Sequence, residues 1–245
     1  EGAGSDTHPF YYSLRSLHTL HLHFHALSAD TKYRAARVLH AFLKSCPELH
    51  TLFLYTDEND SAGGPAPQDA QNLLQMALTG KNKLDTGAPP FRTLSLRACP
   101  YNITRQLASA LDIGKLNKLI LSAGIANFVT TTNEKFWLAL TKRCLDGIKL
   151  TELGCSCLTP ALARFLCSFS GLARLEFSPR FYPDVPSDSG PSGGLEEDRD
   201  AELRLVDAFF NQVLPTHKAS LKHLAFCGDG TMEYMWYITP AYLEQ

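Results

Sequence analysis

The stretch FLKSCPELHTLFL, residues 42–54, joins the end of a predicted helix to a predicted strand. Pro47 has no backbone N–H and disfavours helical geometry in the residue before it, so the helix is expected to end just ahead of it. The next residues follow the pattern Leu49-x-x-Leu52-x-Leu54. Because successive side chains of a strand point to opposite faces, the last two leucines share one face and the residues between them share the other.

The same pattern recurs along the whole chain, which indicates an internal repeat. Each match predicts a short strand with two apolar residues on its buried face. The seven matches are Leu17-x-x-Leu20-x-Leu22, Leu49-x-x-Leu52-x-Leu54, Phe91-x-x-Leu94-x-Leu96, Leu116-x-x-Leu119-x-Leu121, Leu145-x-x-Ile148-x-Leu150, Leu172-x-x-Leu175-x-Phe177 and Leu221-x-x-Leu224-x-Phe226.

The spacing of the motifs is close to regular. Counted between their middle apolar residues, the intervals are 32, 42, 25, 29, 27 and 49 residues. The two long intervals contain segments rich in Pro, Gly, Ser and acidic residues, 57–67 and 179–200, which are predicted to be flexible insertions. Without their 11 and 22 residues the long intervals shorten to 31 and 27. Four of the six original intervals already lie close to a repeat period of roughly 20–29 residues.

Helical patterns lie between the strand motifs. Residues 29–45 place apolar side chains near a 3.6-residue period, and Thr159 followed by Pro160 is typical of a helix start. Helices are predicted over residues 29–45, 68–78, 103–113, 133–144, 160–169 and 200–214. Alternating strands and helices predict an α/β fold with a parallel sheet, stacked as a curved solenoid with the sheet on its concave face and helices on its convex face. The whole chain, 1–245, is expected to form this single domain of about seven irregular repeats.

These repeats resemble the leucine-rich repeats of ribonuclease-inhibitor-like proteins. Units such as FLKSCPELHTLFL and FLCSFSGLARLEFS are similar to those of fungal leucine-rich-repeat proteins, many of which carry an N-terminal F-box. The resemblance implies a substrate-binding region that presents a target to a Skp-cullin ubiquitin ligase. No F-box-like segment precedes Leu14, so the F-box is expected upstream of Glu1. The Asn or Cys that usually follows the strand in these repeats is matched only by Cys99 and, loosely, by Cys227.

Composition restricts the partners. A net charge of -2 and a pI near 6.5 give no sign of a nucleic acid or an anionic membrane as partner. No run of 18 apolar residues occurs, so no membrane span is predicted. Seven cysteines, an odd number and mostly beside apolar residues, indicate reduced thiols and a cytoplasmic or nuclear location.

Candidate chemical groups are few. His21, His23 and His25 alternate along the first strand and could ligate a metal together, although an exposed polar strand face explains them as well. Cys155-x-Cys157 lacks the two-residue spacer of redox and zinc motifs. No phosphate-binding loop and no nucleophile motif is present, so we predict no catalytic residues and no cofactor.

The concave face is the predicted binding surface. It should expose the residues that alternate with the leucines. Basic side chains are expected on four successive strands, beside two aromatic residues. Together with one acidic neighbour, the candidate partner-binding residues are Phe53, Tyr55, Arg97, Lys118, Lys149, Arg174 and Glu176. This set suggests a groove for an acidic or phosphorylated segment of a protein target, although lysine and arginine are also common on an exposed sheet face.

Three functional hypotheses follow. The first is a non-enzymatic recognition module, the substrate-binding region of an F-box-like adaptor. The second is a free-standing repeat scaffold or regulator with no link to ubiquitin. The third is a metal-dependent enzyme that uses the histidine row of the first strand.

Overall fold

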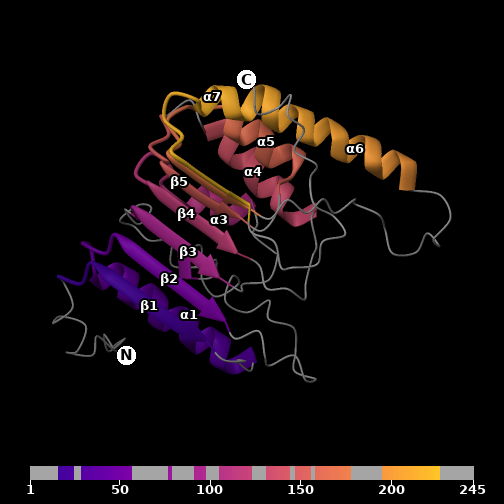
Figure 1. Ribbon diagram of the computed structural model, residues 1–245. Helices are drawn as coiled ribbons and strands as arrows, with labels where there is room; N and C mark the ends of the chain where they lie inside the picture. Colours follow the sequence, from indigo (N-terminus) through magenta and orange to yellow (C-terminus); the bar gives the residue numbers. More distant parts are fainter. Residues whose placement is uncertain are drawn as a thin grey trace, which may run out of the picture.

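The computed structural model describes residues 16–24, 29–56, 77–78, 91–97, 105–122, 131–143, 147–155, 158–177 and 195–226. Strands and helices alternate along these residues, as the repeat pattern predicted (Figure 1). The elements are β1 (Thr19–Phe24), α1 (Ala29–Ser45), β2 (Thr51–Thr56), β3 (Thr93–Arg97), α3 (Arg105–Ala110), β4 (Lys118–Ser122), α4 (Thr131–Arg143), β5 (Glu152–Cys155), α5 (Pro160–Cys167), β6 (Arg174–Phe177), α6 (Leu195–Ala208), a π-helical turn η4 (Phe209–Val213), α7 (Leu214–His217) and β7 (His223–Phe226). None of the described helices is long and apolar enough to cross a membrane.

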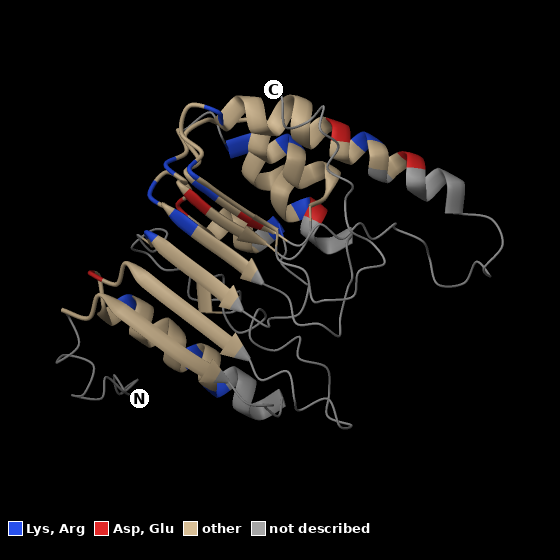
Figure 2. Cartoon of the chain, viewed as in Figure 1, with Lys and Arg blue, Asp and Glu red and all other residues tan. Residues whose placement is uncertain are grey.

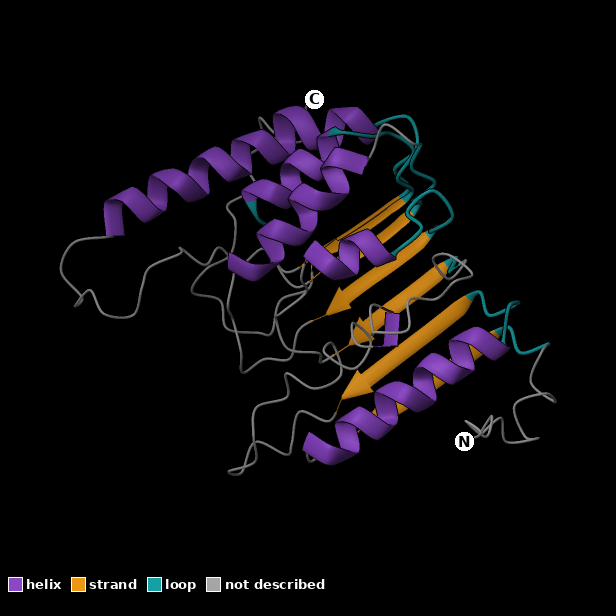
Figure 3. Ribbon diagram, turned by 180° about the vertical axis from the view of Figure 1, so that it is seen from behind, coloured by secondary structure: helices purple, strands orange, loops and turns teal. Residues whose placement is uncertain are grey.

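The seven strands form one open sheet in the order β1 to β7, and every neighbouring pair is parallel. The described helices all lie on one face of this sheet, as the views from both sides show (Figures 1 and 3). This arrangement confirms the predicted α/β class with a parallel sheet, and it is consistent with a solenoid of the leucine-rich-repeat type.

The register aligns the middle apolar residue of each strand. Leu52 pairs with Leu94, Leu94 with Leu119, and Leu119 with Leu153. These leucines are at most 1% exposed, because the sheet covers them on one side and the helices on the other. Each of them is therefore a central residue of the core.

The fifth motif was placed wrongly. The sequence predicted a strand around Ile148 and Leu150, whereas β5 begins at Glu152 and its middle apolar residue is Leu153. Residues 145–155 contain two overlapping matches, because Leu150-x-x-Leu153-x-Cys155 has the same apolar spacing. Packing decides between them: Leu153 is 1% exposed between its neighbours on β4 and β6, while Ile148 is only partly buried.

The predicted helices agree with the structure apart from their ends. The helix over residues 29–45 is confirmed as α1, although one of its apolar residues, Val38, is 45% exposed. Thr159 caps α5 as predicted, since its hydroxyl accepts a hydrogen bond from the Leu162 N–H at 3.2 Å. Of the helix predicted over 68–78, only residues 77–78 are described.

The last predicted helix begins earlier and ends later than expected. Residues 195–200 were assigned to the second insertion but form the first turns of α6. The rest of that insertion, and the insertion at 57–67, lie outside the described residues. The helix continues through η4, in which the Leu214 N–H donates to the Phe209 carbonyl, and then through α7. The π-helical turn ends at Val213, two residues before Pro215, which is consistent with the missing N–H of proline.

His217 at the end of α7 is buried, with 1% of its surface exposed, and links three segments. Its Nε2 donates to the Leu166 carbonyl in α5 at 3.0 Å, and its Nδ1 accepts from the Leu172 N–H ahead of β6 at 3.3 Å. Phe169 packs against the ring with a centroid distance of 5.2 Å. Because a carbonyl oxygen only accepts, this arrangement requires a neutral imidazole with its proton on Nε2.

Candidate functional site

The candidate site is the face of the sheet opposite the helices, which we call the open face (Figure 1). Strand geometry places on it the residues that alternate with the buried leucines. The register aligns them in rows across the sheet, so residues far apart in the sequence become neighbours. Two groups of side chains stand out on the described part of the open face, one aromatic on β1 and β2 and one charged on β4 to β6.

The aromatic group consists of His21 and His23 on β1 with Phe53 and Tyr55 on β2. The rings of His21 and Phe53 stack with their centroids 4.3 Å apart. Phe53 and Tyr55 are nearly parallel, with an interplanar angle of 16° and a centroid distance of 6.3 Å, and His23 lies 6.1 Å from Tyr55. Both histidines are exposed and both β2 rings are half-buried, so part of the ring surface of this group is accessible on the open face.

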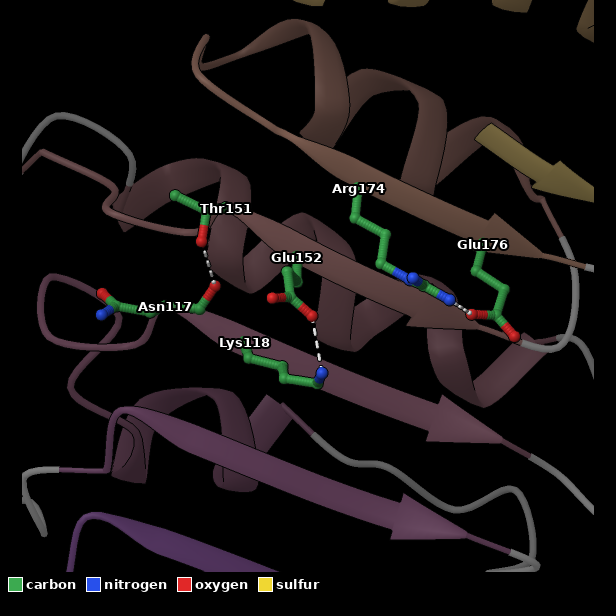
Figure 4. Close-up of polar contacts among 6 residues, drawn as sticks. All are labelled: Asn117, Lys118, Thr151, Glu152, Arg174 and Glu176. Carbon is green, nitrogen blue, oxygen red and sulfur yellow. Dashed lines mark hydrogen bonds and ion pairs between the residues drawn. The ribbon is translucent and has the colours of Figure 1, made fainter. Parts of the chain in front are cut away.

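The charged group consists of two ion pairs (Figures 2 and 4). Lys118 Nζ on β4 lies 2.6 Å from Glu152 Oε2 on β5, and the Arg174 guanidinium lies 3.1 Å from Glu176 Oε2 on the same strand, β6. Their side chains are between 34% and 47% exposed. Each base of this group is therefore balanced by a carboxylate.

This pairing corrects the predicted basic surface. Lys149 was expected on the fifth strand, but it is exposed in the segment before β5 and does not belong to the row. Glu152 takes the place between Lys118 and Arg174, because the strand register aligns these three residues. The error follows directly from the misplaced fifth motif. The overlapping match at residues 150–155 was the signal that could have identified Glu152.

The other predicted residues lie where the pattern placed them. Phe53, Tyr55, Lys118, Arg174 and Glu176 are all on the open face. Arg97 pairs with Tyr55 in register on β3, although its side chain lies outside the described part of the structure. The structure thus brings together an aromatic cluster that the sequence indicated and ion pairs that it did not.

The middle row of the open face alternates large and small residues. Phe53, Ser95, Ile120 and Gly154 follow one another across β2 to β5. Ser95 has no exposed surface, and a Cβ atom added at Gly154 would lie 3.4 Å from Ile120 Cγ2. The large side chains of this row therefore cover the small ones, and the accessible surface of the row comes from the large side chains.

The histidine row is described in part. His21 and His23 share the open face as expected and lie against aromatic rings, whereas His25 is outside the described residues. Within the described ranges no group of three His, Cys, Asp or Glu residues is arranged to hold a metal ion.

None of the described cysteines, Cys46, Cys155 and Cys167, forms a disulfide. Cys46 is 1% exposed and packs in the core, and burial raises the pKa of its thiol. Cys167 is exposed at the end of α5. Cys157 lies outside the described residues.

Comparison of the chain with protein-family models, with curated proteins and with solved structures finds no match. The geometry and chemistry of the open face therefore guide the functional proposal.

Proposed function

We propose that this chain is a non-enzymatic protein-recognition module that binds its target on the open face. The observation that carries the proposal is a seven-stranded parallel sheet whose helices lie on one face, with half-buried aromatic rings and ion pairs on the other. Aromatic side chains dominate the energetics of many protein interfaces, because they bury a large area with few rotatable bonds.

In the finer form of the proposal, the sheet is a leucine-rich-repeat solenoid of the ribonuclease-inhibitor-like kind. The recurring L-x-x-L-x-L spacing and the in-register leucines from Leu20 to Leu224 support this form. The resemblance to fungal F-box proteins then suggests that the target is presented to a Skp-cullin ubiquitin ligase. An acidic or phosphorylated target would have to compete with Glu152 and Glu176 for Lys118 and Arg174. We therefore assign the main anchoring role to the aromatic group.

The adaptor role is tested by affinity purification of the full-length gene product from its own cells, followed by mass spectrometry. We expect Skp and cullin subunits among the proteins that co-purify reproducibly. Their absence under conditions that recover other partners would contradict the adaptor role. That result would favour a free-standing scaffold or regulator with the same open face.

A charge reversal separates binding from stability. Lys118→Glu should weaken binding of a purified target while changing the free energy of unfolding by no more than about 1 kcal/mol, because half-exposed ion pairs contribute little to stability. Lys149→Glu is the matched control: it makes the same charge change on an exposed residue outside the row, and it should leave both quantities unchanged. Chemical denaturation and calorimetric titration measure the two effects. Equal binding by both variants would remove the charged group from the binding surface.

A further inference from the structure

We infer that the target presents two features to the open face, an aromatic side chain to the β1–β2 half and an acid–base pair to the β4–β5 half. This inference rests on the proposed function and names the partner's chemistry. The bound part of the partner protein is a linear segment that lies across the strands.

The β1–β2 half selects an aromatic side chain because it offers rings and no carboxylate. The rings of His21, Phe53 and Tyr55 lie within 27° of one another and are in part accessible. β1, β2 and β3 contain no aspartate or glutamate, and Figure 2 shows no charged residue along the described lengths of β1 and β2. A cation bound there would gain binding free energy only from contact with the ring faces. An aromatic ring of the partner would gain it both from stacking and from burial of its whole surface.

The β4–β5 half selects a pair of opposite charges. Lys118 and Glu152 already satisfy each other at 2.6 Å, so a lone anion would attract the lysine and be repelled by the carboxylate (Figure 4). A partner with an acid above Lys118 and a base above Glu152 gives each of these two residues a second neighbour of opposite charge. No charge is then left unpaired on either side. Such charge complementarity contributes more to specificity than to affinity, because a partner with its acid and base exchanged would place like charges opposite each other and bind more weakly.

The two halves fix the spacing in the partner. β2 and β5 are separated by three strand spacings, which is about 14 Å at roughly 4.8 Å per strand. The register aligns Lys118 and Glu152 with Thr51, so Phe53 also lies two residues, or about 7 Å, further along its strand. The combined separation is about 16 Å, and an extended chain advances about 3.3 Å per residue, so the aromatic residue and the charged pair should be about five residues apart.

The test selects random linear peptides displayed on phage against the immobilised full chain. We expect enriched peptides with an aromatic residue about five positions from an acid–base pair. One enriched peptide is then synthesised, together with a version in which its acid and base are exchanged. Binding of both peptides is measured to the wild type, to Phe53→Ala and Tyr55→Ala, to the double variant Lys118→Glu/Glu152→Lys, and to Lys149→Glu. The double variant keeps an internal ion pair and the net charge, and thermal unfolding checks that each variant folds.

Either aromatic variant should weaken binding of the selected peptide by at least about tenfold, as expected for an anchor at the centre of an interface. The double variant should weaken it similarly and should prefer the exchanged peptide, while Lys149→Glu binds as the wild type does. If binding of the selected peptide is weakened by Phe53→Ala or Tyr55→Ala but unchanged by the double variant, the inference is overturned and the proposed function stands. Peptides insensitive to every open-face change, or no enrichment at all, would overturn the inference and count against the binding role of the face.

Discussion

Truncation of Leu119, Leu153 or Leu175 to alanine is expected to lower the free energy of unfolding by about 2–5 kcal/mol in each case. These residues are aligned on β4, β5 and β6 and are at most 1% exposed. The cost includes the lost transfer free energy of the side chain and the cavity that remains between sheet and helices. Chemical denaturation of the three variants measures it.

The matched control for this prediction is Ile148→Ala. The sequence pattern alone gave Ile148 the central place that Leu153 holds in the structure, and Ile148 is only partly buried. Its truncation should cost about 1 kcal/mol, an ordinary value for a site outside the core. A larger loss for Ile148→Ala than for Leu153→Ala would show that the register of β5 is wrong and that Lys149, not Glu152, belongs on the open face.

Replacement of His217 by leucine is expected to have the second large effect. The change leaves the Leu166 carbonyl and the Leu172 N–H without their imidazole partner in a buried setting. An unsatisfied buried group costs about 1–3 kcal/mol, so the two together should lower the free energy of unfolding by about 2–6 kcal/mol. His217→Gln, whose amide can both donate and accept, is the conservative control and should lose less.

The same residue predicts a pH dependence. Burial lowers the pKa of the His217 imidazole below its ordinary value, and the hydrogen bond to Leu166 offsets part of this shift. The unfolded chain, with an imidazole pKa near 6.5, therefore takes up a proton before the folded chain does. The stabilisation from His217 should be complete above about pH 6.5 and decrease as the pH falls toward the folded value.

Denaturation of the wild type and of His217→Leu at several pH values between about 5 and 8 isolates this contribution, because the other histidines are common to both proteins. The difference in unfolding free energy should shrink toward acid pH. A difference that stays constant over this range would show that His217 is not held neutral by its two hydrogen bonds.

The strands could be predicted from the sequence wherever the L-x-x-L-x-L spacing fits a stretch of residues in only one way. In residues 49–55 only Leu49, Leu52 and Leu54 fit, so the open-face positions of Phe53 and Tyr55 followed from the alternation of a strand. In residues 145–155 two solutions overlap, and long-range packing of Leu153 decides between them. A wrong choice there replaces Glu152 by Lys149 and turns a balanced surface into a basic one.

The helix ends and the buried histidine depended on information that local sequence does not carry. The acidic residues 196–198 resemble an insertion, yet negative charge is also favourable in the first turns of a helix, where α6 places them. The helix was predicted to end at Leu214, but it continues through a π-helical turn to His217. The partners of His217 lie 51 and 45 residues away in the chain, beyond the reach of any local pattern.

The most direct test of the binding role is a comparison of three forms of the full-length gene product in its own cells. The wild type, the double variant Phe53→Ala/Tyr55→Ala and the control Lys149→Glu are purified in parallel, and their co-purifying proteins are quantified. The proposed role predicts a set of proteins that accompany the wild type and the control and are lost from the folded double variant. An unchanged set in all three forms would contradict the claim that the open face binds the target.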